Sequence, residues 1–350
     1  MSKRSIEIIG GGLAGLGLGI RLAQVGVSSR ITEAGHYPRH KVCGEFISGR
    51  GVKLLKDMSL YDRFIDEGAV LARTCRFYGT SSATRLMPLS EPALCFSRYR
   101  MDELMAERYQ ELNGKLVLDH PYPTGKNETR AEIVYATGRR PQMNRRLAYV
   151  GYKFHLENVE LEADLEMHFG EDGYVGLCRV EDGRVNVCGL AKATAETKHL
   201  RAGWQEMFTK TLNQNRRPLF KKLNLLEKTL TFTSALSYPW LPWIPSRHQE
   251  TLSIGDCFAS IPPLTGNGMS MALESSDLTA TWIQRYVSGA LSWRSTVAAA
   301  ANDLNDRFWL RQLCAGPVQK FFMASWPNFL RASAISLAPW YQAALFRVTR

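Results

Sequence analysis

The sequence predicts an α/β fold, in which a Rossmann-like nucleotide-binding domain carries an inserted antiparallel β-sheet domain and a C-terminal helical tail. Three observations predict it: a glycine-rich strand–turn–helix unit at the start, a second glycine-rich turn before a helix near residue 266, and alternating polar and apolar runs between them. The chain has 350 residues, 45% of them hydrophobic, which is enough for a large core and about two domains.

The first element is a dinucleotide cradle between Ile6 and Glu33. A short apolar strand precedes Gly10, Gly12 and Gly15, which stand in Gly-x-Gly-x-x-Gly order and open an amphipathic helix. The first glycine permits a tight turn, the second lets a pyrophosphate approach the backbone, and the third lets helix and strand pack. The helix N-terminus suits phosphates, and Glu33 has the spacing of a carboxylate that binds a ribose.

A second motif lies between Ser253 and Ala280, where a strand ends in Gly255-Asp256 and a Gly-x-Gly loop precedes a helix. With the cradle, it resembles the para-hydroxybenzoate hydroxylase-like superfamily of FAD-dependent oxidoreductases, nearest its geranylgeranyl reductase and flavin-dependent halogenase branch. The resemblance implies a GR2-type flavoprotein, in which the aspartate binds the ribityl chain and the loop and helix N-terminus face the pyrophosphate and the flavin ring. The matching residues are Asp256, Pro263, Gly266, Asn267, Gly268 and Met269.

Two more segments carry the resemblance. The segment CFSRYRMDELMAERY looks like the family's strand-to-helix segment, which implies that Arg98 contacts the flavin and that Asp102 is an acid at the helix N-terminus. The segment HKVCGEFIS resembles the Cys-Gly loop of the reductase branch, which implies that Cys43 is a catalytic residue beside flavin and substrate. A small buried core residue is the alternative for Cys43.

The sequence also departs from the family. Thr137 stands where aromatic hydroxylases carry an aspartate that serves FAD and NAD(P)H, so NAD(P)H or a partner reductase is left open as electron donor. From Tyr174 the chain reads YVGLCR, without the tryptophan and proline of the prenyl-binding strand of archaeal lipid reductases. The stretch PWLPWIP resembles the halogenase motif imperfectly, because Trp240 and Trp243 are one residue too far apart.

Sequence patterns also predict the domain limits. The FAD-binding domain is predicted to comprise residues 1–72, 97–150 and 245–300, and the substrate domain residues 73–96 and 151–244. Runs such as VELEADLEMHF alternate like half-buried strands, with Glu171–Gly173 and Glu181–Gly183 as hairpin turns. Residues 301–350 form the helical segment, in which Pro327 and Pro339 are predicted to separate short helices.

Charge and cysteine content exclude several classes of function. The net charge is +11, with basic pairs such as Arg139-Arg140 and Arg216-Arg217, but no nucleic-acid-binding motif accompanies it, and FAD is itself anionic. The seven cysteines include no Cys-x-x-Cys pair, which argues against a disulfide framework or a metal site and favours the cytoplasm. Basic and aromatic residues in the tail leave peripheral contact with the inner face of the membrane as an alternative.

The sequence thus predicts an FAD-dependent oxidoreductase that acts on an apolar or aromatic small molecule, such as a polyketide- or isoprenoid-like intermediate of secondary metabolism. The first chemistry predicted is hydride transfer between reduced flavin and a carbon–carbon double bond, or its reverse, with Cys43 near the reacting carbon. The alternative is hydroxylation by a monooxygenase, and halogenation or electron transfer to a quinone ranks lower. Glu45 and His155 are candidates for proton transfer, with a structural role as the alternative. The sequence leaves the oligomeric state open.

Overall fold

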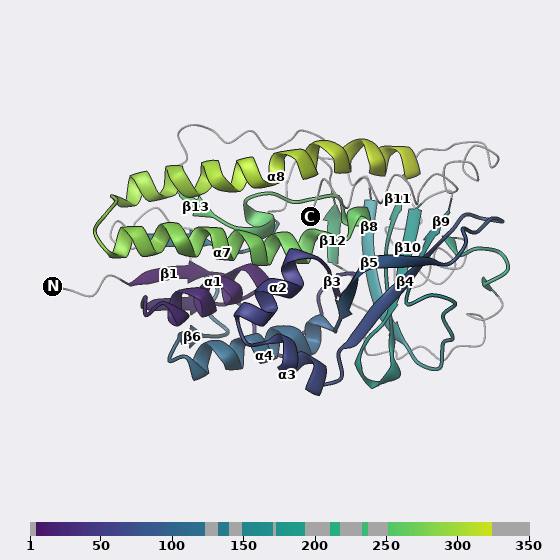
Figure 1. Cartoon of the computed structure of the whole chain (residues 1–350), viewed down its shortest axis with the longest axis horizontal. Helices are drawn as coiled ribbons and strands as arrows, with labels where there is room; N and C mark the ends of the chain where they lie inside the picture. The colour runs from purple at the N-terminus through teal and green to yellow at the C-terminus, as the bar shows by residue number, and fades with distance from the viewer. Residues whose placement is uncertain are drawn as a thin grey trace.

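The structure, a computed structural model, describes residues 5–122, 132–139, 149–170, 173–192, 211–217, 233–236 and 251–323. The described strands form a five-stranded and an eight-stranded sheet, which lie toward opposite ends of the molecule's long axis (Figure 1). Helices cover the five-stranded sheet, and the glycine-rich motifs belong to this half of the molecule.

The five-stranded sheet is parallel and has the strand order β13-β7-β1-β2-β6. Its strands are β1 (Ile6–Ile9), β2 (Ser29–Thr32), β6 (Lys115–Val117), β7 (Glu132–Tyr135) and β13 (Leu252–Ser253). The central strand β1 has buried isoleucines at three of its positions, as expected for a parallel strand that is covered on both faces. Because β7 pairs with both β1 and β13, the sheet brings the start of the chain close to residue 252.

The helices pack in layers around this sheet. They are α1 (Leu13–Gln24), α2 (Arg50–Asp57), α3 (Tyr61–Asp66), α4 (Arg98–Glu111), α7 (Gly268–Val287) and α8 (Trp293–Met323). Helix α1 contacts both α4 and α7, and α8 lies along α7 as an outer layer (Figure 1). The hydroxyl of Tyr109 in α4 donates a 2.7 Å hydrogen bond to the Ser29 carbonyl, which holds α4 against β2.

The eight-stranded sheet is antiparallel except for the pairing of β4 with β9. Its order is β12-β8-β11-β10-β9-β4-β5-β3, and its strands are β3 (Phe46–Ile47), β4 (Val70–Tyr78), β5 (Met87–Cys95), β8 (Tyr149–Leu156), β9 (Leu165–Phe169), β10 (Gly173–Arg179), β11 (Val185–Lys192) and β12 (Thr233–Leu236). The predicted turn at Glu181–Gly183 is confirmed as the short 3-10 helix η1 between β10 and β11.

The alternating run that starts at Val159 becomes a strand only at Leu165, later than predicted. The reason is Asp164, whose carboxylate accepts hydrogen bonds of 2.7 and 2.9 Å from the backbone N–H groups of Arg73 and Thr74. The side chain of Asp164 therefore takes up backbone donors of β4 that a longer β9 would have used.

The two faces of the eight-stranded sheet have different neighbours. Toward the glycine-rich motifs, Leu264 and Cys314 pack on an apolar group that consists of Cys75, Phe77, Met87, Phe169, Tyr174 and Leu190. The opposite face carries a separate core that includes Tyr152, Phe154, Val175, Leu177 and Val187. Because side chains alternate along a strand, Lys153 and His155 of β8 belong to the face toward the glycine-rich motifs.

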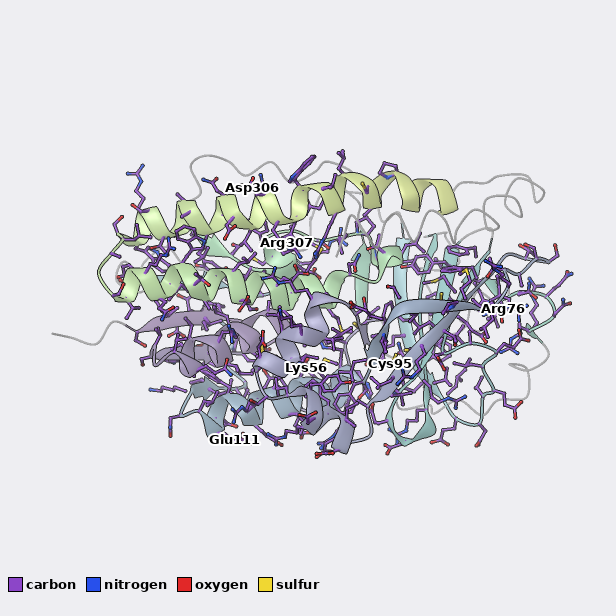
Figure 2. The ribbon with its side chains drawn as sticks, in the orientation of Figure 1. Lys56, Arg76, Cys95, Glu111, Asp306 and Arg307 are labelled. Atoms are coloured by element: carbon purple, nitrogen blue, oxygen red, sulfur yellow. The ribbon has the colours of Figure 1, made fainter. Side chains whose placement is uncertain are left out.

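Helix α8 is fixed to α7 by a buried carboxylate. Glu274 of α7 is 1% exposed and accepts 2.7 Å hydrogen bonds from Arg307 and Arg311 of α8, and Figure 2 shows Arg307 between the two helices. The helix begins at Trp293 and continues across the predicted domain limit at residue 300. Pro327 and Pro339 lie outside the described residues. None of the helices in the described ranges is long and apolar enough to cross a membrane.

The predicted fold class is therefore confirmed: an α/β domain with a parallel sheet, a second and mostly antiparallel sheet, and a helical C-terminal region. The exact domain limits stay a prediction.

Candidate FAD site

The turn after β1 has the close approaches that its glycines predict. Gly10 has φ +108°, and a Cβ atom there would lie 2.5 Å from the carbonyl oxygen of Ala136. A Cβ atom on Gly15 would lie 1.8 Å from the carbonyl oxygen of Gly10. Neither position accepts a side chain, so the turn and the first helical turn pack as the motif requires.

Gly12 differs from these two glycines because the space beside it is open. A Cβ atom there would meet only Arg98 Nη2, at 3.9 Å. Gly12 is also the N-cap of α1, and neither a side-chain cap nor a first-turn acid occupies this helix end. The helix N-terminus and the adjacent arginine thus leave room for an anion, such as a pyrophosphate, at Gly12.

Glu33 lies at the end of β2 and faces the same turn. Its Oε2 accepts a 2.6 Å hydrogen bond from Gly11 N, and its Oε1 accepts from Gly35 N at 3.0 Å and Arg39 at 2.5 Å. Burial raises the pKa of Glu33, but the hydrogen bond and charge of Arg39 outweigh this and lower it to about 2. Glu33 is therefore ionised, and its Oε2 keeps a lone pair for a ribose hydroxyl.

The second motif reaches the same place from β13. Gly255 opens the 3-10 helix η4 (Gly255–Cys257) with φ +58°, and a Cβ atom there would lie 2.8 Å from Ala14 Cβ. The next residue, Asp256, is thereby placed near the start of α1. Asp256 is solvent-exposed, but protein surrounds it closely enough for desolvation to raise the pKa of its carboxyl, while the charges of Arg139 and Arg98 oppose this shift. Among the described residues, no donor is hydrogen-bonded to its carboxylate, which fits a ligand with several hydroxyls.

The loop before α7 packs on the short strand β3. It contains η5 (Pro263–Thr265) and Gly266, which has φ +65° and whose Cβ would lie 2.3 Å from Phe46 Cζ. Helix α7 then begins at Gly268, with Asn267 as its N-cap. Asn267 and Met269 are buried, at 3% and 6% exposure. The predicted loop residues therefore lie together at a helix N-terminus, beside the chain that leads from Cys43 to β3.

Arg98 and Asp102 form a buried ion pair, and this corrects the role predicted for Asp102. Arg98 begins α4, and its Nε and Nη2 each donate a 2.7 Å hydrogen bond to the carboxylate of Asp102. Asp102 is fully buried in the second turn, while Ser97 caps the helix by accepting from Arg100 N. Asp102 is thus not a helix N-terminal acid: it holds the Arg98 guanidinium toward Gly12.

Cys43 lies in the loop between β2 and β3, partly exposed and packed against the main core. Burial raises the pKa of its thiol, although the Arg98 guanidinium beside it favours the thiolate. The thiol is therefore protonated at neutral pH. Contact with Arg98 agrees with a place beside the flavin, and packing agrees with a core role, so the catalytic role of Cys43 stays a prediction.

A buried polar cluster next to Cys43 is more extensive than the sequence indicates. The carboxylate of Glu45 accepts hydrogen bonds from Lys153 Nζ, from His155 Nε2 at 2.8 Å and from Arg98 N at 2.6 Å. All three side chains, those of Glu45, Lys153 and His155, are at most 1% exposed. Burial raises the pKa of Glu45, but Lys153 and His155 outweigh it and lower the pKa to about 2.

The sequence contains only a faint signal of this cluster. Lys153 and His155 are two positions apart in a strand and therefore share a face, but nothing in the local pattern shows that this face is buried. Glu45 has φ 57°, a left-handed conformation that is rare for glutamate and is held here by its three hydrogen bonds.

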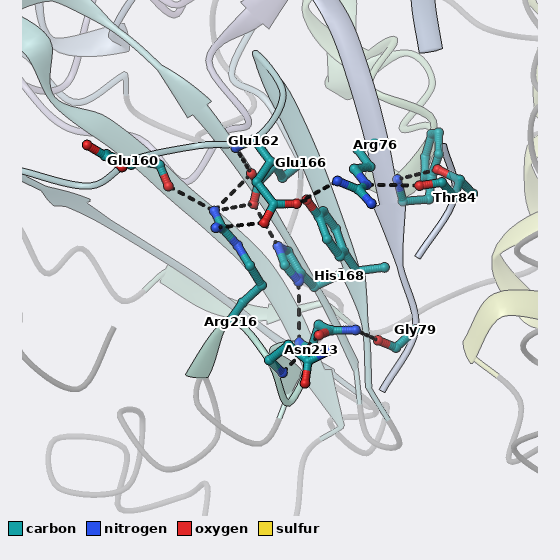
Figure 3. Close-up of polar contacts among 12 residues, drawn as sticks. Arg76, Gly79, Thr84, Glu160, Glu162, Glu166, His168, Asn213 and Arg216 are labelled. Carbon is teal, nitrogen blue, oxygen red and sulfur yellow. Dashed lines mark hydrogen bonds and ion pairs between the residues drawn. The ribbon is translucent and has the colours of Figure 1, made fainter. Parts of the chain in front are cut away.

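A second polar network lies on the opposite face of the eight-stranded sheet (Figure 3). Glu166 accepts from Arg216 at 3.0 Å and lies 3.1 Å from His168 Nε2, while Tyr78 stacks on His168 at 4.4 Å. Arg216 is 6% exposed, so it is not part of the surface basic pair that the sequence predicts with Arg217. Its charge is balanced inside the protein, which makes this network structural.

Thr137 follows β7, next to the second motif. Its Oγ1 lies 3.7 Å from Cys257 Sγ in η4, so this position holds a neutral hydroxyl; its equivalence to the acid of aromatic hydroxylases stays a prediction from the resemblance. Trp240 and Trp243, the candidate halogenase tryptophans, lie outside the described residues.

The site fits an FAD molecule in four respects. It has two glycine-rich turns, open space at Gly12, an ionised Glu33, and an Asp256 without a hydrogen-bond donor among the described residues. Residues 3–144 match the family model of the FAD binding domain. The chain thus carries an FAD-binding domain, which confirms the predicted cofactor, and its fold agrees with the predicted resemblance to the para-hydroxybenzoate hydroxylase-like superfamily.

Solved flavoprotein structures share the whole fold. PqsL, a probable FAD-dependent monooxygenase from Pseudomonas aeruginosa, has 12% sequence identity and a TM-score of 0.74, with 95% of this chain and 99% of that chain covered. The p-nitrophenol 4-monooxygenase PnpA from Pseudomonas putida has 13% identity and a TM-score of 0.73, with 99% of each chain covered. The flavin-dependent brominase Bmp2 has 16% identity and a TM-score of 0.73, with 97% of this chain and 92% of that chain covered.

A search of curated protein sequences finds no match. The residue-by-residue roles in the FAD site, and the nearness to the geranylgeranyl reductase branch, stay predictions.

Proposed function

We propose that the protein is an FAD-dependent monooxygenase that hydroxylates an apolar or aromatic small molecule. The observation that carries this proposal is the apolar face of the eight-stranded sheet, which meets the loop before α7 through Leu264. Phe77, Phe169 and Tyr174 are buried in the apolar group on this face, so the wall on the proposed substrate side is apolar and aromatic. The fold shared with PqsL and PnpA over nearly the whole chain supports the proposal, because PnpA is a p-nitrophenol 4-monooxygenase and PqsL has been solved with 2-aminobenzoylacetate.

In the reaction, one atom of O2 enters a C–H bond of the substrate as a hydroxyl group and the other leaves as water, with two electrons and two protons supplied by the reductant and solvent. Bound FAD would supply the chemistry of oxygen activation. The protein residues bind and orient: Gly12 and Arg98 would hold the pyrophosphate, Asp256 the ribityl chain, and Glu33 the ribose. The buried face of the second sheet excludes water from the substrate side.

Hydride transfer to a carbon–carbon double bond, the chemistry that the sequence first predicts, remains the second candidate. The observation that favours it is the protonated thiol of Cys43, which lies partly exposed beside Arg98 and is able to donate a proton. In this case Cys43→Ser should keep FAD bound but lower turnover, and turnover should persist without oxygen once the flavin is reduced chemically.

The experiment that separates the two candidates uses oxygen-18 gas and the FAD-loaded enzyme with a panel of phenols and prenylated or polyketide-like aromatics. Product that contains the label, and that does not form anaerobically, supports the monooxygenase. Unlabelled reduced product under anaerobic conditions overturns it in favour of hydride transfer.

A further inference from the structure

Three buried polar atoms next to Cys43 have no hydrogen-bond partner among the described residues. They are His155 Nδ1, Asn186 Oδ1 and His40 Nδ1. His155 and Asn186 are direct partners across β8 and β11, and the His40 ring lies 5.5 Å from the His155 ring. Buried polar atoms nearly always have a partner, so three such atoms in one place indicate a bound polar group.

The neighbours of these atoms show which are hydrogen-bond acceptors. Glu45 is ionised, so His155 Nε2 must donate its hydrogen to it, and Lys153 already balances the carboxylate charge. Nδ1 is thus the ring nitrogen of His155 that has no partner among the described residues, and it is an acceptor when the ring carries the single hydrogen given to Glu45. Asn186 Nδ2 donates to the carbonyl oxygen of Cys43 at 3.1 Å, which identifies the free atom as the amide oxygen, another acceptor.

The charges around this place select the kind of donor. The cations Lys153, Arg98 and Arg184 are close to this cluster, against the anions Glu45 and Asp102. Burial and the charge of Lys153 lower the pKa of His40 to about 4, so His40 is neutral. An ammonium group would be repelled by this surplus of cations, whereas a neutral hydroxyl would not.

The sheet face continues from these acceptors to the apolar group. Asn186 is paired with Cys178 in β10, and Gly176 follows on the same face, opposite Met167 of β9. The Met167 side chain covers Gly176, because a Cβ atom on Gly176 would lie 3.5 Å from Met167 Cε. A ring that lies against Met167 would have the acceptors at one end and Phe169 at the other.

We propose that His155 Nδ1 and Asn186 Oδ1 form the polar subsite of the substrate pocket and bind a hydroxyl group on an otherwise apolar aromatic substrate. Glu45 is the positioning residue, because it fixes which nitrogen of His155 carries the hydrogen. The His40 ring lies 4.7 Å from the tilted ring of the exposed Tyr99, so His40 is at the solvent side of this subsite. The inference rests on the proposed function in one respect: it takes the face beside the FAD site as the substrate side.

A pair of probes tests the subsite by binding alone. In the FAD-loaded enzyme, 2-naphthol should bind about tenfold more tightly than 2-methoxynaphthalene, as one extra hydrogen bond implies, followed by the change in flavin fluorescence. His155→Leu should bring the ratio of the two affinities close to one. Asn186→Ser, a second and milder variant, should do the same. Met167→Leu is the matched control on the same face, and it should change both affinities together and keep the preference.

Glu45→Gln gives a sharper result. The amide oxygen of the glutamine would accept from Lys153 and Arg98 N, and its NH2 group would donate to His155 Nε2, so the hydrogen of His155 moves to Nδ1. The preference should then reverse toward 2-methoxynaphthalene, whose ether oxygen is an acceptor. A merely structural Glu45 would weaken both probes equally.

Equal affinities of the unmodified enzyme for the two probes, or a preference that both His155→Leu and Asn186→Ser retain, would overturn the subsite. These results do not depend on oxygen chemistry. Oxygen-18 incorporation without a probe preference would support the monooxygenase and contradict the subsite. A probe preference without oxygen-18 incorporation would support the subsite and contradict the monooxygenase.

Discussion

The hydroxyl of Ser276 donates a 2.7 Å hydrogen bond to the carbonyl oxygen of Ala14, although 262 positions separate the two residues. Ala14 lies in the first turn of α1, and Gly255 packs against its side chain from the other motif. The two glycine-rich motifs are thus fixed to each other through the start of α1. The proposed FAD site is therefore built from two segments that are distant in sequence. Short contacts at the N-terminal end of α1 hold these segments together.

The open space at Gly12 predicts that Gly12→Asp removes FAD. The new carboxylate would occupy the place expected for the pyrophosphate and repel it, while the backbone keeps its ordinary φ of −87°. The FAD content of the purified protein and its affinity for added FAD measure the effect. Ser28→Asp adds the same charge at an exposed position past the far end of α1 and should leave FAD bound. A yellow Gly12→Asp protein with unchanged affinity would contradict the cradle assignment.

The buried pair of Arg98 and Asp102 predicts a separation of stability from cofactor binding. Asp102→Ala leaves the Arg98 charge buried without its partner and should cost about 3–5 kcal/mol of unfolding free energy. The double variant Arg98→Met with Asp102→Leu removes both charges and should recover most of that stability. The affinity of the double variant for FAD should nevertheless stay low, because the guanidinium beside Gly12 is gone. Thermal unfolding and FAD titration of both variants provide the measurement, and normal FAD affinity in the double variant would show that Arg98 is only structural.

Much of the FAD site could be predicted because its residues are close in sequence. Gly10, Gly12 and Gly15 form a local motif whose spacing is set by one turn and one helix, and Asp256 likewise follows its own strand. The parallel sheet then follows, since the strand–helix–strand pattern permits few topologies.

The polar contacts across the molecule could not be predicted in the same way. Asp102 binds Arg98 one helical turn away, but the sequence does not show that this face of α4 is buried. Glu45 meets Lys153 and His155 across more than 100 positions, and no local pattern shows that the loop before β3 lies against β8. The sequence predicts Arg216 at the surface for the same reason, because its carboxylate partner lies 50 positions away in β9.

Glu33 predicts a pH dependence of stability. Its pKa in the folded protein is about 2, below the ordinary value of 4.5, so its contribution is complete above pH 4.5 and is lost as the pH falls toward 2. Between about pH 6 and pH 3 this loss amounts to about 2 kcal/mol. The urea midpoint of the FAD-loaded protein should therefore decrease less in Glu33→Gln than in the unmodified protein over this range. An identical pH dependence of the two proteins would show that Arg39 does not stabilise the ionised carboxylate.

Thr137 predicts slow reduction of the enzyme by free NADH or NADPH. A hydroxyl that contacts Cys257 replaces the acid of aromatic hydroxylases, so the group expected to help hold both FAD and the reductant is missing. Anaerobic stopped-flow mixing should show slow bleaching of the flavin absorbance with either nucleotide, and faster bleaching with a partner reductase or with dithionite. Thr137→Asp should accelerate reduction by the nucleotide, while Thr137→Val, which has the same shape but no charge, should not. Rapid bleaching of the unmodified enzyme by NADPH alone would refute the prediction, and the electron donor would then be the free nucleotide despite the missing acid.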